Sequence, residues 1–241
     1  MSKTVYFNGH NLSTNFYVHD LVRPAVPHNV TTHEVPGHDG LVYANTQLQA
    51  LIITMTLTYI NADSATRRAN LRELESWLNV DEPKVLQFSD DGDLYYLAIP
   101  QNGGNTRERL NASSVMVEFL IPDPAMYKGA SMATPSKSGN NYTFTGNYPC
   151  RPVLTITGAQ PNSSGYYGIK MDDSKIIDVP LTSGSHTVVI DCDARTVTVD
   201  NANVIPTITS DWFVCTPGTH KIVKYLGSQT TLAIAYWPRW L

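Results

Sequence analysis

The feature that most constrains the fold is a change of hydrophobic period within residues 48–82. Over most of the segment between Leu48 and Ile60 every second side chain is large and apolar, and the side chains between them are mainly threonine, which predicts a long, half-buried strand. After Asp63 or Ser64, either of which can cap a helix, leucines at positions 71, 74 and 78 fall on one helical face. The charged residues of this helix of about four turns, Arg67 among them, are expected mostly on its other faces.

Composition extends the β interpretation to the rest of the chain. Only 16% of the 241 residues are charged, whereas Thr, Ser, Asn, Gly and Pro are abundant, as in strands joined by turns. A hairpin is predicted over residues 85–99, with Ser89–Asp93 as its turn. A further alternating strand is predicted over Ser114–Ile121, where Pro122-Asp123-Pro124 ends it.

Residues 128–141 are small and polar and show no period, which predicts a domain boundary, placed between residues 130 and 131. Beyond it, short strands recur at the spacing of a β-sandwich, with turns at Asp172-Asp173 and at residues 200–203. The expected strands are Val153–Thr157, Tyr166–Met171, Lys175–Val179, Thr187–Asp191, Thr196–Val199, Lys221–Tyr225 and Thr231–Tyr236. The predicted fold class is therefore mainly β: an α+β domain with one helix over residues 1–130, then an all-β domain over residues 131–241.

Charge and hydropathy argue against several functions. The formal net charge is −4, so no basic excess is present to grip nucleic-acid phosphates. No apolar run of about eighteen residues predicts membrane insertion. The N-terminus enters a strand-like segment, Val5–Phe7, without a secretory signal, so synthesis in a cytoplasm is expected. Cys150, Cys192 and Cys215 are widely spaced and are expected to be small buried side chains, with one disulfide among them left open.

A search for chemistry assigns no catalytic residue, cofactor or metal. The phosphate-binding, dinucleotide-binding and nucleophile-elbow motifs are absent, and Pro36 rules out a zinc-binding helix after His33-Glu34. The cluster His28, His33, His38 and Asp39 is the best candidate for a metal site, although a solvated or interface loop is the preferred interpretation.

Two further groups of residues have competing interpretations. Asp90, Asp91 and Asp93 could bind calcium but lack the required spacing, so a turn is expected, and Asp191 and Asp193 fit an exposed sheet surface. Aromatic side chains of the second half are expected mainly in the core, with some available to stack on sugars. These aromatic residues are Tyr166, Tyr167, Trp212, Tyr236, Trp237 and Trp240.

An ordered set of segments resembles the distal tail proteins of siphophages. In the first half the set includes Phe7-Asn8-Gly9, Arg23-Pro24, residues 34–40, the strand Leu51–Tyr59, the helix end Leu74–Leu78, Leu86–Asp91, Tyr95–Ala98, Val117–Phe119 and Asp123-Pro124 with Tyr127. In the second half, Pro152–Gly158, Val189–Asp191 and Pro217–His220 look like the family's galectin-like sandwich, with His220 where the family usually has Asn.

The resemblance implies a structural virion protein, not an enzyme, located at the tail tip. It implies a homo-hexameric ring that joins the tail tube protein to the tail-associated tip protein and helps to hold receptor-binding proteins. DNA would pass through the ring without specific binding. The loop Pro36, Gly37, His38, Asp39 and Gly40 is the predicted interaction site, in which the glycines permit a tight turn. The alternative function is a carbohydrate-binding β-sandwich protein that recognises host cell-wall glycans; a wall hydrolase has no assembled motif behind it.

Overall fold

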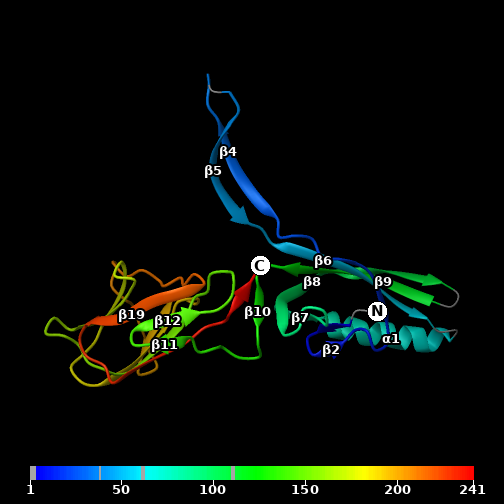
Figure 1. Cartoon of the computed structure of the whole chain (residues 1–241). Helices are drawn as coiled ribbons and strands as arrows, with labels where there is room; N and C mark the ends of the chain where they lie inside the picture. Colours follow the sequence, from blue (N-terminus) through cyan, green and yellow to red (C-terminus); the bar gives the residue numbers. More distant parts are fainter. Residues whose placement is uncertain (1–3, 38, 61–62, 110–111) are drawn as a thin grey trace. The chain divides into compact units, whose positions relative to one another are not determined.

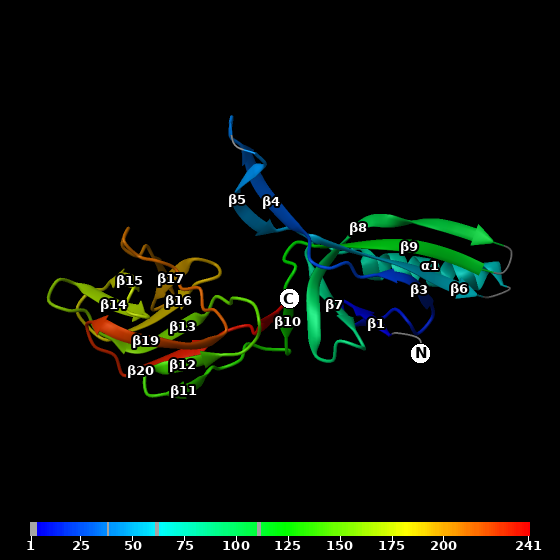
Figure 2. The ribbon, with the colours of Figure 1, turned by 45° about the horizontal axis from the view of Figure 1, so that its top comes forward.

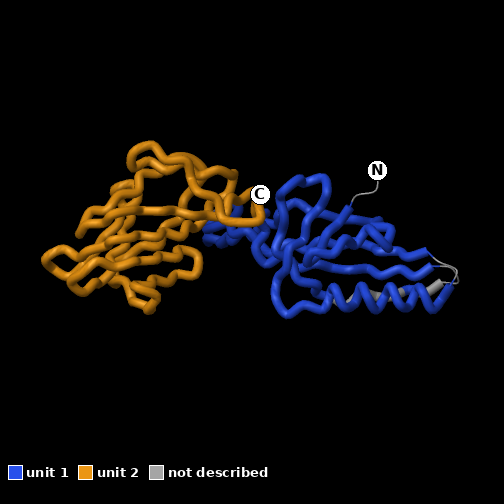
Figure 3. Tube along the Cα trace, turned by 90° about the horizontal axis from the view of Figure 1, so that it is seen from below, with its two compact units in different colours: residues 1–126, 241 blue, residues 127–240 orange. Residues whose placement is uncertain are grey.

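The structure, a computed structural model, describes residues 4–37, 39–60, 63–109 and 112–241. It divides into two compact units, residues 1–126 with Leu241 (unit 1) and residues 127–240 (unit 2); Figure 3 colours the two units separately. The chain is mainly β, with one helix in its described part, which confirms the predicted fold class. That helix is neither long nor apolar enough to cross a membrane.

Unit 1 is built on one antiparallel sheet with the strand order β2-β1-β7-β8-β9-β6-β3. The helix α1 lies along this sheet, and β4 and β5 form a separate two-stranded ribbon (Figures 1 and 2). The elements are β1 (Val5–Phe7), β2 (His10–Asn11), β3 (Tyr17–Val22), β4 (His28–Glu34), β5 (Leu41–Leu48), β6 (Leu51–Ile60), α1 (Ser64–Leu78), β7 (Lys84–Phe88), β8 (Leu94–Arg109) and β9 (Ala112–Ile121).

The central strands β6 and β9 show why the two-residue period matters. Their register places Ile53 opposite Phe119 and Met55 opposite Val117, and all four side chains are fully buried. The intervening residues of β6, such as Ile52 and Thr54, point to the other face and are exposed or half-buried. One face of the sheet therefore forms the core of unit 1 and the other face stays open.

The helix α1 packs Leu71 and Leu74 into this core. Asp63 caps it, because its carboxylate accepts the backbone N–H groups of Ala65 and Thr66 at 3.2 and 2.9 Å. The charged residues lie mostly on the other faces, as predicted, but Arg67 is an exception, because its side chain is buried, with 7% exposed. Arg67 lies four residues before Leu71 and so shares its face, where a long aliphatic stem packs as well as a leucine.

Unit 2 is a sandwich of two five-stranded antiparallel sheets, β11-β12-β19-β14-β15 and β18-β17-β16-β13-β20 (Figure 2). The strands are β11 (Ser136–Ser138), β12 (Asn141–Phe144), β13 (Val153–Ala159), β14 (Tyr166–Met171), β15 (Lys175–Pro180), β16 (His186–Asp191), β17 (Thr196–Val199), β18 (Ala202–Val204), β19 (Gly218–Leu226) and β20 (Thr231–Ala235). In addition, β10 (Met126–Lys128) pairs with β21 (Arg239–Trp240).

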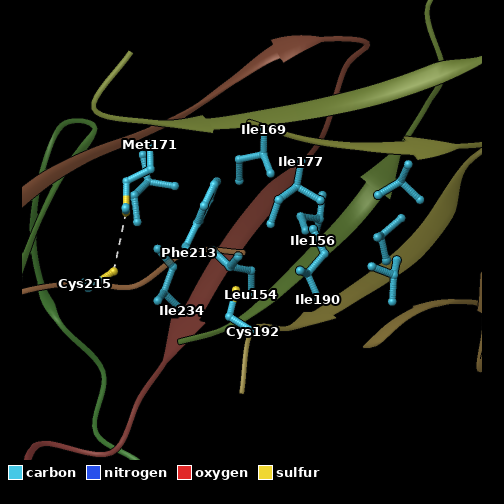
Figure 4. Close-up of a cluster of buried hydrophobic side chains, with 14 of the residues drawn as sticks. Leu154, Ile156, Ile169, Met171, Ile177, Ile190, Cys192, Phe213, Cys215 and Ile234 are labelled. Carbon is cyan, nitrogen blue, oxygen red and sulfur yellow. Dashed lines mark hydrogen bonds between the residues drawn. The ribbon is translucent and has the colours of Figure 1, made fainter. Parts of the chain in front are cut away.

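The two sheets of the sandwich enclose one core, part of which Figure 4 shows in close-up. Leu154 and Ile190 from one sheet face Ile169 and Ile177 from the other, around the ring of Phe213. The three cysteines are buried free thiols in this core, and the Cys215 thiol lies 3.6 Å from the Met171 sulfur. Burial raises the pKa of Cys150 to about 11 and that of Cys192 to about 12, so these thiols are unreactive core residues.

Several predicted elements are confirmed and others need correction. The strands β14 and β17 have the predicted bounds, and residues 85–99 form the predicted hairpin. The predicted turns also occur, with positive φ at Asp172, Asp173, Asp200 and Asn201. Two predictions were too coarse: residues 128–141 contain the short strand β11, and Ala202 begins β18 instead of belonging to a turn. Both strands have only three residues, too few to carry an alternating signal.

Candidate functional site

The predicted interaction residues lie at the tip of the β4–β5 ribbon. Glu34 ends β4 and Leu41 begins β5, so Pro36, Gly37, Asp39 and Gly40 connect the two strands; His38 lies outside the described residues. Gly37 and Gly40 have φ values of +82° and +87°, a conformation that non-glycine residues adopt only with strain. No atom lies within 4 Å of a Cβ built at either glycine, so the constraint is the backbone conformation and not the available space.

The ribbon itself is exposed along almost its whole length. Every residue of β4 and all of β5 except Leu48 are exposed, and Figure 1 shows the ribbon projecting from the strands of unit 1. The register places Thr32 opposite Tyr43 and Glu34 opposite Leu41, so Val30, Leu41 and Tyr43 share one face. Their exposed fractions are 52%, 59% and 62%.

The ribbon lacks the covering layer that an isolated pair of strands needs for stability. A two-stranded hairpin without a covering layer is at best marginally stable in water. Clustered apolar side chains on a protruding surface are typical of protein–protein contacts. The apolar face formed by Val30, Leu41 and Tyr43 is thus suited to packing against another protein chain, and we call it the ribbon face.

The open face of the unit 1 sheet is a second surface with exposed apolar residues. His19 Nε2 lies 2.7 Å from the Thr58 hydroxyl, which lies 2.9 Å from the Ser114 hydroxyl. These three residues form a polar ladder across β3, β6 and β9. Exposed apolar side chains surround this ladder: Tyr17, Ile52, Ile60 and Met116. The face combines these hydroxyl groups with apolar groups, and its imidazole, His19, also contacts the Asp20 carboxylate at 2.9 Å through Nδ1.

An ion-pair cluster joins two of the segments that carry the family resemblance. The Arg23 guanidinium donates to Asp90 at 2.5 Å and to Asp91 at 2.7 Å, and its Cζ lies 4.7 Å from the centre of the Phe88 ring. These residues are 67 and 68 positions apart in the sequence. The aspartates therefore hold an arginine beside the turn between β7 and β8, which explains them without a calcium ion.

The structure does not gather the histidines that sequence analysis considered for a metal. His28 and His33 stand at the two ends of β4, five residues apart, which corresponds to about 16 Å along an extended strand. Across the described part of the chain, no group of three or more His, Cys, Asp or Glu side chains could hold a metal ion. Asp191 accepts the N–H groups of Asp193 and Ala194 at 2.9 Å each, so it stabilises a turn.

Two matching His–Asp clusters, which sequence analysis missed, organise unit 2. His220 Nδ1 lies 2.6 Å from Asp172, and its Nε2 lies 2.8 Å from the Thr216 carbonyl. His186 Nδ1 likewise lies 2.7 Å from Asp200, and its Nε2 lies 3.1 Å from the Thr182 carbonyl. Each imidazole thus has a carboxylate oxygen near Nδ1 and a backbone carbonyl oxygen near Nε2, so both ring nitrogens are engaged.

Each cluster fastens a hairpin turn to a neighbouring strand of the same sheet. The hydrogen bond that the His186 ring donates to the Asp200 carboxylate raises the pKa of His186, and the same bond holds the pKa of Asp200 below its ordinary value. Burial opposes ionisation of Asp172, yet hydrogen bonds from His220 and the Lys221 N–H lower its pKa. The signal that could have found the clusters is the recurring pattern Thr-x-Gly-x-His at residues 182–186 and 216–220.

The aromatic residues considered for sugar stacking are mainly core residues. Tyr167 and Tyr236 are buried, and their hydroxyls bond to Gln229 and to the backbone N–H of Thr145. Tyr166 is exposed, whereas Trp212, Trp237 and Trp240 are half-buried. Trp237 makes an edge-to-face contact with Tyr127 at 6.4 Å. The described aromatic residues therefore mostly stabilise unit 2 instead of presenting flat binding platforms.

Comparison with known families matches both units. The profile described as phage tail protein RIFT-related domain matches residues 9–122, and the profile of the siphovirus-type tail component, C-terminal domain, matches residues 145–240. Together they cover most of the chain, in the order in which the two units occur. No curated protein sequence matches the chain at the level considered significant.

Solved structures with the same fold come from phages. The Dit protein of phage SPP1, described as a paradigm of the hub adsorption apparatus in phages that infect Gram-positive bacteria, has a TM-score of 0.82 at 16% identity over 100% of both chains. A chain from the phage P2 baseplate in its activated conformation with Ca has a TM-score of 0.55 at 6% identity over 99% of this chain and 98% of that one. The strontium form gives 0.54 at 6% identity over 98% and 97%.

Proposed function

Because the chain belongs to the siphovirus distal tail protein family, we propose that six copies form a closed ring within the hub at the tail tip. The family is structural, and its place in the virion is the distal end of the tail. The proposal concerns how this chain assembles and what it joins. The ring would connect the tail tube protein to the tail-associated tip protein and help to hold receptor-binding proteins.

The ribbon face is the single observation that carries the proposal. It presents Val30, Leu41 and Tyr43 to solvent on a two-stranded ribbon that has no covering layer. A ring of identical subunits needs a heterologous contact, in which one surface of each copy meets a different surface of the next. We assign the ribbon face, with the tip residues Pro36, Gly37, His38, Asp39 and Gly40, to one side of that contact.

The distribution of charge supports different positions for the two domains in the ring. Residues 1–126 carry fourteen Asp or Glu and eight Lys or Arg, a net charge of −6, whereas residues 127–241 carry seven and nine, a net charge of +2. We propose that residues 1–130 form the central ring and residues 131–241 lie outside it. An acidic channel would repel DNA phosphates, so DNA would pass without being retained.

Light scattering after size exclusion tests the ring, with the tip protein added in a parallel sample. The expected mass of a ring is about 160 kDa, six times the chain mass of 26.6 kDa. Leu41→Glu should abolish this species, because a carboxylate on the ribbon face would be desolvated in the contact. Ile208→Glu is the matched control, since Ile208 is fully exposed in unit 2.

Two results would contradict the proposal. One is a chain that stays monomeric at high concentration and does not associate with the tip protein. The other is a ring that forms equally well with Leu41→Glu and with the wild-type sequence.

A further inference from the structure

Unit 2 contains a basic cavity that lies outside the ribbon face assigned above to the ring contact. The cavity measures about 630 Å³ and is lined by residues of β11, β12 and β19 and by residues 229–232, which lead into β20. Its volume lies within the range of about 300–1,000 Å³ that is typical of small-molecule sites. All of its lining residues belong to unit 2, and both of its lysines are exposed, so it is an open cavity at the surface of the sandwich.

Two lysines give the cavity its charge. Lys137 stands opposite Tyr142 in the β11–β12 pair, and its ammonium group lies 5.4 Å from the centre of that ring. The Lys224 ammonium group donates to the Gly227 carbonyl at 3.4 Å. Both contacts orient the ammonium groups, but neither supplies a negative charge to balance them.

The lining contains no carboxylate, although unit 2 has several. The cavity residues are Lys137, Asn140, Tyr142, Ile222, Val223, Lys224, Gln229, Thr230, Thr231 and Leu232. Other aspartates of the unit are engaged elsewhere: Asp173 pairs with Lys170 and Lys221, and Asp193 pairs with Arg151. The two ammonium charges therefore share a cavity in which the protein provides no counter-charge.

The remaining polar side chains of the lining can donate hydrogen bonds as well as accept them. The Gln229 amide oxygen accepts the Tyr167 hydroxyl, which fixes the amide and leaves its NH₂ group as a donor. Thr230 and Thr231 add hydroxyls, and Asn140 adds an amide. The two ammonium groups are complementary to an oxyanion, which supplies acceptors and negative charge together, and the hydroxyl and amide side chains are complementary to hydroxyl groups, which both donate and accept.

We propose that this basic cavity binds an anionic polyol, a hydroxyl-rich molecule or polymer unit that carries phosphate or carboxylate. The ammonium groups of Lys137 and Lys224 would contact the anionic group, and the amide and threonine side chains would contact the hydroxyls. A bound acidic peptide would need apolar recesses for its side chains. The predominantly polar lining offers few of these, which favours the polyol.

Calorimetric titration of the full-length chain tests the assignment with defined probes. Glycerol 3-phosphate and glucuronate are the anionic probes, and glycerol and glucose are their neutral counterparts. At least one anionic probe should bind and both neutral probes should not. Binding of only glycerol 3-phosphate would identify a phosphate-bearing ligand, and binding of only glucuronate would identify a uronic acid; either result supports the proposal.

Lysine variants locate the binding. Lys137→Met and Lys224→Met should each weaken binding of the anionic probe by about tenfold, because each removes a charge-assisted hydrogen bond. Lys175→Met is the matched control, since it removes the same charge from β15, at the opposite edge of the same sheet. It should leave binding unchanged, and melting temperatures of all variants would show that the sandwich is intact.

Three outcomes would overturn the proposal. The first is no binding of either anionic probe at millimolar concentration. The second is equal loss of affinity in Lys175→Met and in the cavity variants, which would indicate a nonspecific charge effect. The third is binding of tetraglutamate in place of both polyol anions, which would assign the cavity to an acidic protein segment. None of these outcomes bears on ring formation, so the two proposals fail independently.

Discussion

The β4–β5 ribbon and the sandwich of unit 2 use the same antiparallel pairing, but only the sandwich is complete within one chain. In the sandwich, Leu154 and Ile190 are fully buried between two sheets, and His–Asp clusters fasten two of its hairpin turns. In the ribbon, Leu41 and Tyr43 are mostly exposed, and no second layer covers them. Backbone pairing alone thus does not make a stable element, because apolar burial supplies the larger stabilisation.

This difference separates two roles for apolar residues in the molecule. Those of the sandwich stabilise the isolated chain, whereas those of the ribbon face are available to stabilise an assembly. Substitutions in the two regions should therefore affect different measurements.

The largest effect is expected when a leucine is shortened to alanine in the sandwich core, compared with the same change on the ribbon. Leu154→Ala leaves a cavity in the sandwich core and should lower the free energy of unfolding by about 2–5 kcal/mol. Leu41→Ala removes an exposed side chain and should change the unfolding of the dissociated chain by less than about 0.5 kcal/mol. Guanidinium denaturation followed by tryptophan fluorescence measures both; equal effects would remove the distinction between the regions.

An intermediate effect is expected at the ion-pair cluster of unit 1. Arg23→Met keeps the aliphatic stem on Phe88 but leaves Asp90 and Asp91 without their guanidinium partner. Because these groups are partly exposed, the loss of stability should be only about 1–2 kcal/mol and should shrink at high salt. Lys84→Met, which removes an exposed pair with Glu82, serves as the control and should have no measurable effect.

The smallest effect is expected from pH, and in the sandwich it should come mainly from the His–Asp clusters. The folded-state pKa of His186 is raised, so its stabilisation is complete below its ordinary value of 6.5 and is lost as the pH rises through the folded-state pKa. The folded-state pKa values of Asp172 and Asp200 are lowered, so their stabilisation is complete above about 3.8 and is lost as the pH falls through those values.

The sandwich should accordingly melt at the highest temperature near pH 6 and at lower temperatures at pH 8 and pH 3; pH 8 stays below the ordinary thiol pKa of 9.0, above which the buried cysteines would add a loss of their own. Calorimetric scans across this range measure the effect, and His186→Gln should flatten the alkaline side. An unchanged alkaline slope in His186→Gln would show that the His186–Asp200 pair is not its source.

The sequence predicted those elements whose residues face a core on one side only. β6 was predicted because apolar side chains such as Met55 recur in it at every second residue. α1 was predicted because apolar side chains such as Leu71 recur in it at the period of a helix, and because Asp63 is a strong cap. The turns at Asp172 and Asp200 were predicted because Asp and Asn tolerate positive φ. The resemblance to the tail protein family, carried by segments from both halves, was also correct.

The elements that were missed lack such a one-sided pattern. β5 is exposed on both faces, so its apolar and polar residues do not sort by burial. β3 carries an irregularity between His19 and Val22, where Asp20 has a positive φ, and this breaks the alternation. The His–Asp clusters join residues 14 and 48 positions apart, a pairing that only the sheet register reveals. The interaction role of the ribbon tip stays a prediction.

Amide hydrogen exchange of β4 and β5 tests most directly whether the ribbon is completed by a neighbouring chain. In the dissociated chain these amides should exchange quickly while those of β13 and β16 stay protected, because the ribbon is marginal alone and the sandwich is not. In the assembled particle the ribbon amides should become protected. Equal exchange of the ribbon in both states would contradict the account.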